Sequence, residues 1–321
     1  MKTIPFSDIE GVRVGNAQDS AAMTGVTVFL FPEPAPAAVT VLGGGPASRE
    51  TALLDPERNV QSLDALVLAG GSTFGLEASH GVLDCLERRG IGFYTGDTHV
   101  PIVCQSDIYD LSYGACGVRP DKAMGFAACE DALAGGKAES GNVGAGTGAT
   151  VGKPQGLPQA QKSGIGYAAA QLGALQVGVA AVVNAYGDIF HEGKKVAGMM
   201  TVDRGGFADS TEALLEMQPS NLFTGNTTLV AIFTNAKLTP SALKKVSGMA
   251  SAGMARAIRP VFTMADGDTV YALSVGSEKV VADVNVVGTM AAGLVEEAIF
   301  DAVESSRIPE EEYLDTIQHG K

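Results

Sequence analysis

The 321-residue sequence predicts an α+β protein in which strands and helices form layers. Strand-like segments arrive mostly in neighbouring pairs with helices gathered between them, so the strict β-α-β alternation of a doubly wound parallel sheet is missing. A hydrophobic fraction of 45% is enough for a packed core, and 41 glycines in strand-like surroundings indicate tight turns and close backbone approaches. The length fits one large domain or two ordinary ones.

The first elements are strands. Residues 24–31 are β-branched or apolar and residues 39–42 are again strand-like, so the proline-rich turn at 32–36 predicts a hairpin or two adjacent strands. The apolar run at 65–69 predicts a further strand that ends at two glycines. Ser72 then caps a helix that stops at Arg88-Arg89-Gly90.

The middle of the chain predicts a helix, a strand pair and a loop. The helix covers 121–134 and ends at a glycine pair. Residues 164–170 and 175–184 predict two strands about a Leu-Gly turn, because apolar residues alternate with smaller ones. The polar stretch 203–226 is the most loop-like segment, and it leads abruptly into a β-branched strand at 227–234.

The last third predicts two helices around two strands. The helices cover 240–257 and about 279–304, and the strands lie near 261–263 and 269–274. No internal repeat or low-complexity linker divides the chain.

The charge balance excludes several classes of function. Lys and Arg total 22 against 36 Asp and Glu, a net charge of 22 − 36 = −14, whereas a dedicated nucleic-acid binder needs a basic surface. The start of the chain meets Pro5 and acidic residues too early for a secretory signal, and no apolar run is long enough to span a bilayer. We therefore expect a soluble, cytoplasmic protein without a membrane partner.

Cysteine and histidine spacing predicts no metal site and no disulfide, and the sequence implies no cofactor. The four histidines are scattered without metal-ligand spacing. In a reducing compartment the cysteines most often act as small buried hydrophobes. They have no CxxC spacing: Cys85, Cys104, Cys116 and Cys129.

The glycine-rich segment 144–148 is a weak candidate for a phosphate cradle. It lacks the GxxxxGK[ST] order, because Lys153 is followed by Pro154, and its third glycine misses the GxGxxG spacing. Close packing of small residues is the favoured interpretation. An uncleaved small-molecule or nucleotide-binding protein remains an alternative.

The start of the strand at 227 carries a second candidate. Asn226-Thr227 can be an ordinary turn into a strand, but a long loop here ends at a hydroxyl residue that opens a buried-looking strand. If the Asn226–Thr227 peptide is cut, Thr227 gains an α-amine whose usual pKa is about 7.7–8.0, beside its own hydroxyl. Nucleophile and general base then reside in one residue. The same hydroxyl could make the cut by attacking the Asn226 carbonyl.

Over nearly its whole length the chain resembles the P1 (S58) family of self-processing N-terminal-nucleophile hydrolases. This family includes the L-aminopeptidase/D-esterases, the β-peptidyl aminopeptidases and the nylon-oligomer (6-aminohexanoate oligomer) hydrolase. Several motifs in the same order carry the resemblance: Val12–Asn16, Gly43–Pro46 with Arg49–Thr51, Leu68–Leu76, Asp110-Leu111, Gly141–Lys153, Val183–Asp188, Asn226–Val230 and Asp266–Asp268.

The resemblance implies a four-layer αββα sandwich formed by a single domain, 1–321, and autocleaved into an α chain 1–226 and a β chain 227–321. It implies Thr227 as nucleophile, with Lys153 beside it as a cation that depresses the pKa of the new amine. Lys153 could otherwise be a surface lysine ending a glycine-rich turn.

The remaining site residues also come from the resemblance. Asn184 matches the asparagine whose amide donates to the developing oxyanion. Asp266 and Asp268 match the polar pair that orients nucleophile and lysine, although Asp-Gly-Asp by itself predicts a hairpin turn. Tyr109 and Tyr113 are considered as substrate contacts.

These residues together predict an autoprocessed aminopeptidase or amidase that hydrolyses small peptide-like amides or esters through an acyl-enzyme. The aminopeptidase branches commonly carry Ser as nucleophile and a Ser/Glu pair, so Thr227 with two aspartates looks closer to the nylon-oligomer hydrolase branch. An acyltransferase of the ornithine acetyltransferase type is the alternative within enzymes. Family members generally form tetramers or larger assemblies, so the resemblance implies a homo-oligomer. L-, D- and β-amino-acid amides and ω-amino-acid oligomers stay open as substrates.

Overall fold

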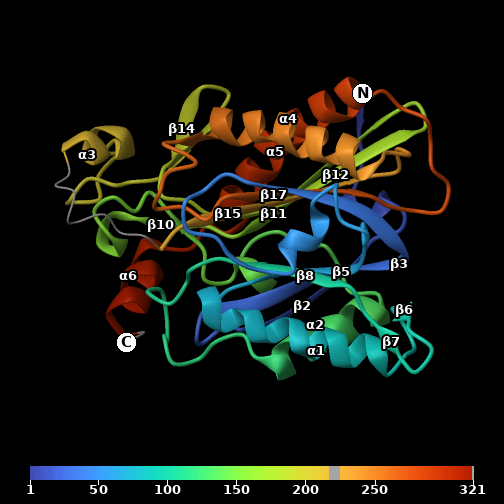
Figure 1. Cartoon of the computed structure of the whole chain (residues 1–321). Helices are drawn as coiled ribbons and strands as arrows, with labels where there is room; N and C mark the ends of the chain where they lie inside the picture. Colours follow the sequence, from blue (N-terminus) through green and yellow to red (C-terminus); the bar gives the residue numbers. More distant parts are fainter. Residues whose placement is uncertain (217–224, 320–321) are drawn as a thin grey trace.

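Two halves of a folded β-sheet lie face to face between two pairs of helices (Figure 1). The computed structural model describes residues 1–216 and 225–319. Helices α4 and α5 cover one side, and α1 and α2 cover the other. The predicted αββα layering is therefore confirmed.

The main sheet contains ten strands. Its hydrogen-bonded order is β1-β11-β12-β15-β17-β3-β5-β8-β4, and β2 pairs with β3. The strands are β1 Lys2–Thr3, β2 Arg13–Asp19, β3 Thr24–Val41, β4 Ala47–Arg49, β5 Ser62–Ala69, β8 Val103–Asp107, β11 Ile165–Leu172, β12 Leu175–Asn184, β15 Thr227–Thr234 and β17 Thr269–Ser274. Short strands outside it are β6 Phe93–Tyr94, β7 His99–Val100, β9 Thr150–Val151, β10 Gln161–Lys162, β13 Asp188–His191, β14 Lys194–Ala197 and β16 Ile258–Arg259.

Strand β3 belongs to both halves of the sheet. Its first part pairs with β2 and β5, and its last part, residues 37–41, pairs with β17. The hairpin or two adjacent strands predicted around the prolines are therefore wrong, because one continuous strand covers the segment. A residue that precedes proline is pushed toward extended backbone, so alternating prolines at 32, 34 and 36 keep the strand extended. They also interrupt its pairing with β5 between Leu30 and Ala35, where the strand passes from one half to the other.

The helices are α1 Ala78–Glu87, α2 Lys122–Ala134, α3 Ser210–Glu216, α4 Pro240–Ala257, α5 Val284–Ser305 and α6 Glu310–His319. The predictions for α2 and α4 are confirmed: Asp121 caps α2 by accepting from Met124 N at 2.8 Å, and Gly135 ends it at φ +89°. Ser72 does not cap a helix, because Gly71 precedes a 3₁₀ turn, η3 Ser72–Glu77, and α1 starts only after it.

Several late elements differ from prediction. No strand covers 261–263; the short β16 ends earlier, and the backbone then bends, with Phe262 at φ +59°. The last long helix begins at Val284 rather than near 279, since Asp283 caps it by accepting from Asn285 N at 2.8 Å. Helix α6 was not predicted. Helix α3 lies inside the segment predicted as a loop, and residues 217–224 of that segment lie outside the described residues.

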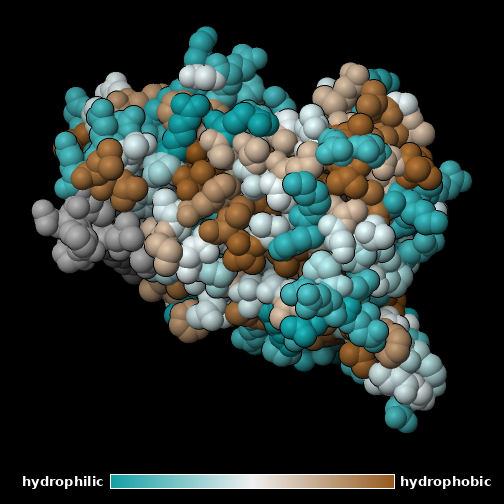
Figure 2. Space-filling view, turned by 45° about the horizontal axis from the view of Figure 1, so that its top comes forward, coloured by the Kyte–Doolittle hydropathy of each residue, from teal (hydrophilic) through white to brown (hydrophobic). Residues whose placement is uncertain are grey.

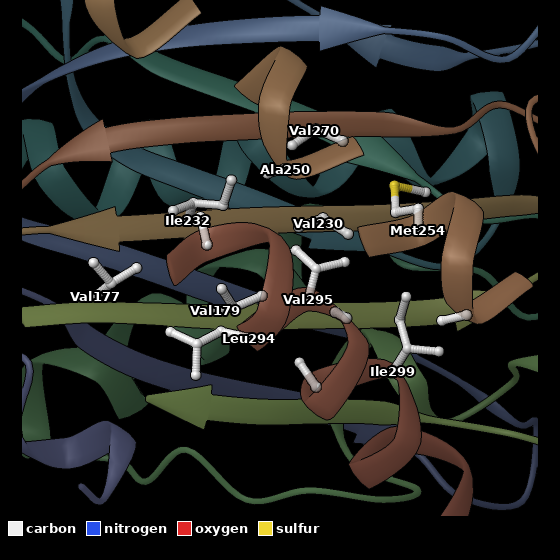
Figure 3. Packing of buried hydrophobic residues seen from close by; sticks show 14 of the residues in the cluster. Val177, Val179, Val230, Ile232, Ala250, Met254, Val270, Leu294, Val295 and Ile299 are labelled. Atoms are coloured by element: carbon white, nitrogen blue, oxygen red, sulfur yellow. The ribbon is translucent and has the colours of Figure 1, made fainter. Parts of the chain in front are cut away.

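Three hydrophobic cores separate the layers. The core beneath α4 and α5 joins strand residues such as Val179 and Ile232 to helix residues such as Val295 (Figure 3). An inner core fills the space between the sheet halves, where the rings of Phe29 and Phe233 lie 5.0 Å apart. A third core lies under α1 and α2.

Glycines let helices approach the sheet on both outer sides. A Cβ on Gly166 of β11 would lie 2.2 Å from Ala298 O of α5, and one on Gly15 of β2 would lie 2.2 Å from Ala132 N of α2. Both positions therefore require a residue without a side chain. Part of the glycine excess thus serves layer packing.

The outer surface is mixed in character. In the view that brings the α4 and α5 side forward, hydrophobic residues form several separate groups among hydrophilic ones (Figure 2). Within the described ranges, no helix has the length and apolar character needed to cross a membrane.

Candidate active site

Thr227 and Asn184 face each other across two neighbouring strands. Thr227 is the first residue of β15 and Asn184 the last of β12, and the antiparallel register pairs them directly. Both side chains lie on the inner-core face, since they share the alternation of Leu229 and Val182. Thr227 is 3% exposed and Asn184 is fully buried. The pairing therefore places an amide beside a hydroxyl in a dry environment.

Lys153 is buried beside this pair, so the surface-lysine interpretation is wrong. Its ammonium group donates to Asn184 Oδ1 at 2.7 Å, to the Asn184 carbonyl at 2.9 Å and to the Gly225 carbonyl at 3.4 Å. Gly152 precedes it at φ +73°, where a Cβ would lie 2.0 Å from Met199 N. The glycine thus allows a sharp backbone turn that directs the Lys153 side chain into the protein.

Asp266 and Asp268 precede β17 and act as backbone acceptors. Asp268 accepts from Thr228 N at 2.7 Å and from Phe262 N at 3.0 Å. Asp266 accepts from Tyr186 N at 3.1 Å. The Asp-Gly-Asp segment does not join a hairpin, because β16 pairs with β13 and β17 pairs with β15 and β3. It instead ties the start of β15 to the loop before β17.

The Asn226–Thr227 peptide is held from two sides. The Asn226 carbonyl accepts from Gly267 N at 2.9 Å and also from the Thr227 hydroxyl. A Cβ on Gly267 would lie 2.7 Å from Thr227 Oγ and 2.8 Å from the Gly45 carbonyl, so only glycine lets the backbone come this close. A backbone N–H and a hydroxyl thus converge on one carbonyl oxygen.

Burial shifts the pKa values of the charged groups toward neutrality. It lowers the pKa of Lys153 to about 7, against the opposing attraction of Asp266, Asp110 and Asp268. Burial, followed by the charge of Asp266, raises the pKa of Asp268 to about 8. Burial also raises the pKa of Asp266. Groups that titrate near neutral pH can exchange protons at little cost.

The structure therefore brings together all five predicted site residues and both residues of the predicted cleavage site. Sequence reasoning missed the backbone N–H of Gly267 and the Tyr109 carbonyl, which accepts from Asn184 Nδ2 at 3.0 Å. It also missed Asp110, whose charge acts on Lys153. The motif Asp110-Leu111 marked this segment, but nothing in the sequence showed what the aspartate does.

The other candidates have packing roles. Tyr113 is buried and its ring stacks on Tyr313 of α6, with centroids 5.5 Å apart. Gly144 starts the 3₁₀ turn η4 Gly144–Gly146, where a Cβ would lie 2.2 Å from Thr27 Oγ, so the supposed phosphate cradle is filled by protein. Among the described residues, no group of three or more His, Cys, Asp or Glu could hold a metal ion.

Comparison with known proteins gives one consistent result. The model of peptidase family S58 matches residues 5–309. An uncharacterized aminopeptidase of Mycobacterium tuberculosis is 39% identical over 291 residues, which cover 85% of this chain and 81% of that protein. A 6-aminohexanoate-oligomer endohydrolase of a Kocuria species is 34% identical over 278 residues, 85% of this chain and 75% of that protein.

Solved structures show the same fold at lower identity. An L-aminopeptidase D-Ala-esterase/amidase of Ochrobactrum anthropi, described as a variant of the Ntn hydrolase fold, superposes with a TM-score of 0.67 at 20% identity. The match covers 98% of this chain and 94% of that one. A β-aminopeptidase of a Burkholderia species gives a TM-score of 0.64 at 20% identity, over 98% and 93% of the two chains.

Proposed function

The chain belongs to peptidase family S58, and from that premise we propose that it is an amide hydrolase which cuts itself between Asn226 and Thr227 and then uses Thr227 as an N-terminal nucleophile. The observation that carries the proposal is the convergence of Gly267 N–H and the Thr227 hydroxyl on the Asn226 carbonyl. It combines a nucleophile next to a carbonyl with a donor already aimed at the oxygen.

The first reaction is the self-cleavage. Thr227 Oγ attacks the Asn226 carbonyl carbon, while Gly267 N–H stabilises the charge that develops on the oxygen. The C–N bond breaks, the proton that leaves Oγ ends on the nitrogen of Thr227, which becomes an amine, and Asn226 is left as an ester on Oγ. Water then hydrolyses the ester, giving an α chain that ends at residue 226 and a β chain that begins with Thr227.

The second reaction is hydrolysis of the substrate. The free α-amine of Thr227 takes the hydroxyl proton as Oγ attacks the substrate carbonyl, and the leaving amine receives that proton. Lys153 stays beside the amine and favours its neutral, basic form. Asn184 carries a second hydrogen on Nδ2 for the substrate oxyanion. Water releases the acyl group from Oγ.

The names of the relatives support a substrate class. The relatives named above are aminopeptidases and a 6-aminohexanoate-oligomer hydrolase. We therefore propose small peptide-like amides or esters, including ω-amino-acid oligomers, as substrates. A homo-oligomer of processed chains remains part of the proposal.

A denaturing gel tests the cleavage. In proportion to 226 and 95 residues of a 32.8 kDa chain, the wild type should give bands of about 23 and 10 kDa, the smaller beginning with Thr227. Thr227→Ala should stay intact and inactive. Thr234→Val, which removes a threonine hydroxyl at the far end of the same strand, should cleave normally. A single full-length wild-type band with full amidase activity would overturn the proposal.

A further inference from the structure

Asp110 is a buried carboxylate to which the mechanism assigns no step. It is 4% exposed and accepts from Gly71 N at 2.7 Å and from Thr24 Oγ at 2.7 Å. Its two oxygens thus bind two segments that are distant in sequence, the glycine turn after β5 and the start of β3. A buried carboxylate needs such donors to remain there.

The surrounding glycines make room for this carboxylate. A Cβ on Gly70 would lie 1.9 Å from Asp110 Oδ2, and one on Gly148 would lie 2.5 Å from Asp110 Cβ. Two separate glycine-rich segments therefore close around one aspartate. Longer side chains at either glycine would displace it, so the fold reserves this space for Asp110.

The position of Asp110 affects the site through its own backbone. The peptide unit that enters Asp110 carries the Tyr109 carbonyl, and that carbonyl accepts from Asn184 Nδ2 at 3.0 Å. The other end of the Asn184 amide, Oδ1, accepts from Lys153 Nζ at 2.7 Å and from Thr150 N at 3.1 Å. Both the oxygen and the nitrogen of the Asn184 amide are thus fixed by hydrogen bonds. The position of the nitrogen, which bears the donor hydrogens, depends on the Tyr109 carbonyl.

We propose that Asp110 is a positioning residue: by fixing the Tyr109–Asp110 peptide, it holds the Asn184 amide in the orientation that presents its remaining hydrogen to the substrate oxyanion. This inference rests on the proposed function, in which Asn184 stabilises that oxyanion. A misplaced donor lowers kcat rather than substrate affinity, because the interaction is made in the transition state.

Removal of the carboxylate should therefore affect turnover. In D110A both anchoring bonds are lost, and kcat per cleaved chain should fall about 10- to 100-fold with KM nearly unchanged. In D110N the amide oxygen can still accept from Gly71 N, and the NH₂ can donate to the Thr24 hydroxyl, so kcat should recover to within about threefold of the wild type. Asp64→Asn is the matched control, since Asp64 is another buried aspartate that accepts from a backbone N–H, Ile102 N at 2.7 Å.

A double-mutant cycle with Asn184→Ala separates positioning from a general defect. D110A and D110N both remove the charge that acts on Lys153, so the comparison between these two variants isolates the anchoring bonds. If Asp110 acts through Asn184, D110A/N184A should match D110N/N184A. The cleaved fraction is read from gels, and kcat is measured with a small amide and an ester. Should D110A fail to fold, Thr24→Val removes one of the two anchoring bonds and is placed in the same cycle.

The outcomes separate this inference from the proposed function. A wild-type chain that neither cleaves nor turns over amides defeats the proposed function and this inference with it. An active wild type whose D110A variant keeps its kcat, or in which D110A and D110N still differ once Asn184 is absent, defeats the positioning role alone. Failure of D110N to recover kcat also counts against it.

Discussion

The buried ammonium group of Lys153 should lower the stability of the fold. Its pKa falls from 10.5 to about 7 because the site is dry. This difference corresponds to about 5 kcal/mol that folding loses at neutral pH, because each pKa unit is about 1.4 kcal/mol. The two shorter hydrogen bonds to Asn184 offset part of the loss, since a buried acceptor left unpaired costs about 1–3 kcal/mol.

Replacement of Lys153 by methionine, which is similar in size, should therefore stabilise the protein at pH 7, by about 2 kcal/mol. The sign should reverse at high pH. The unfolded lysine binds more protons than the folded one between about pH 7 and 10.5, so wild-type stability rises with pH over that window. The methionine variant lacks this gain. Near pH 9.5, one unit below 10.5, about 1 kcal/mol of the wild-type penalty remains, so the lost hydrogen bonds should leave the variant less stable by only about 1 kcal/mol.

The comparison uses T227A and T227A/K153M, which should both remain single uncut chains. Urea denaturation then gives the difference between their free energies of unfolding. Asp268, with a pKa of about 8, is largely protonated at pH 7, so the substitution does not leave it as a bare charge there. A loss of more than about 2 kcal/mol at pH 7, or a difference that does not change with pH, would refute the claim that desolvation dominates.

Three further predictions concern packing. Gly267→Ala should slow the proposed self-cleavage at least about tenfold on gels, because the added methyl would lie 2.7 Å from the Thr227 hydroxyl. Gly248→Ala on α4, with nothing within 4 Å, should cleave normally and gain about 0.5–1 kcal/mol of stability. Phe233→Ala should cost about 3–5 kcal/mol in urea denaturation, and an unchanged midpoint would contradict its role in the inner core. Asp188→Ala should also cost about 3–5 kcal/mol, because the buried carboxylate accepts from Met199 N and Ser210 N and pairs with the partly buried Lys195 at 2.6 Å; a loss below about 1 kcal/mol would contradict this.

Elements with a strong local pattern were predictable from the sequence. The strand at β15 and the helix at α4 fall within the predicted ranges, because β-branched runs and proline-started amphipathic segments have few alternatives. The four layers and the five site residues came from the resemblance, since no spacing rule joins Lys153 to Thr227. Their convergence depends on strand register, which is a property of the whole sheet.

The failures have tertiary causes. The proline segment of β3 has the composition of a turn. It is extended because the strand passes here from one half of the sheet to the other, and the local sequence does not show that two halves form. Helix α6 is acidic and polar, and it is held by contacts with distant residues: Tyr313 donates to the Leu157 carbonyl at 2.9 Å and lies under the Arg204 guanidinium. Asp110 is an ordinary loop aspartate in sequence, and only the folded chain shows that two glycine segments close around it.

The order of the central strands also sets when the site can exist. Strand β17 lies between β15 and β3, so one of the last strands of the chain must insert beside one of the first before the sheet is complete. Gly267, which supplies its N–H to the Asn226 carbonyl, directly precedes β17. A growing chain therefore cannot form the Gly267 N–H contact with the Asn226 carbonyl until the residues up to the end of β17 have been made and have docked. If the proposed self-cleavage occurs, the precursor should therefore stay whole until β15 and β17, which belong to the same future chain, are already paired with β12 and β3 of the other.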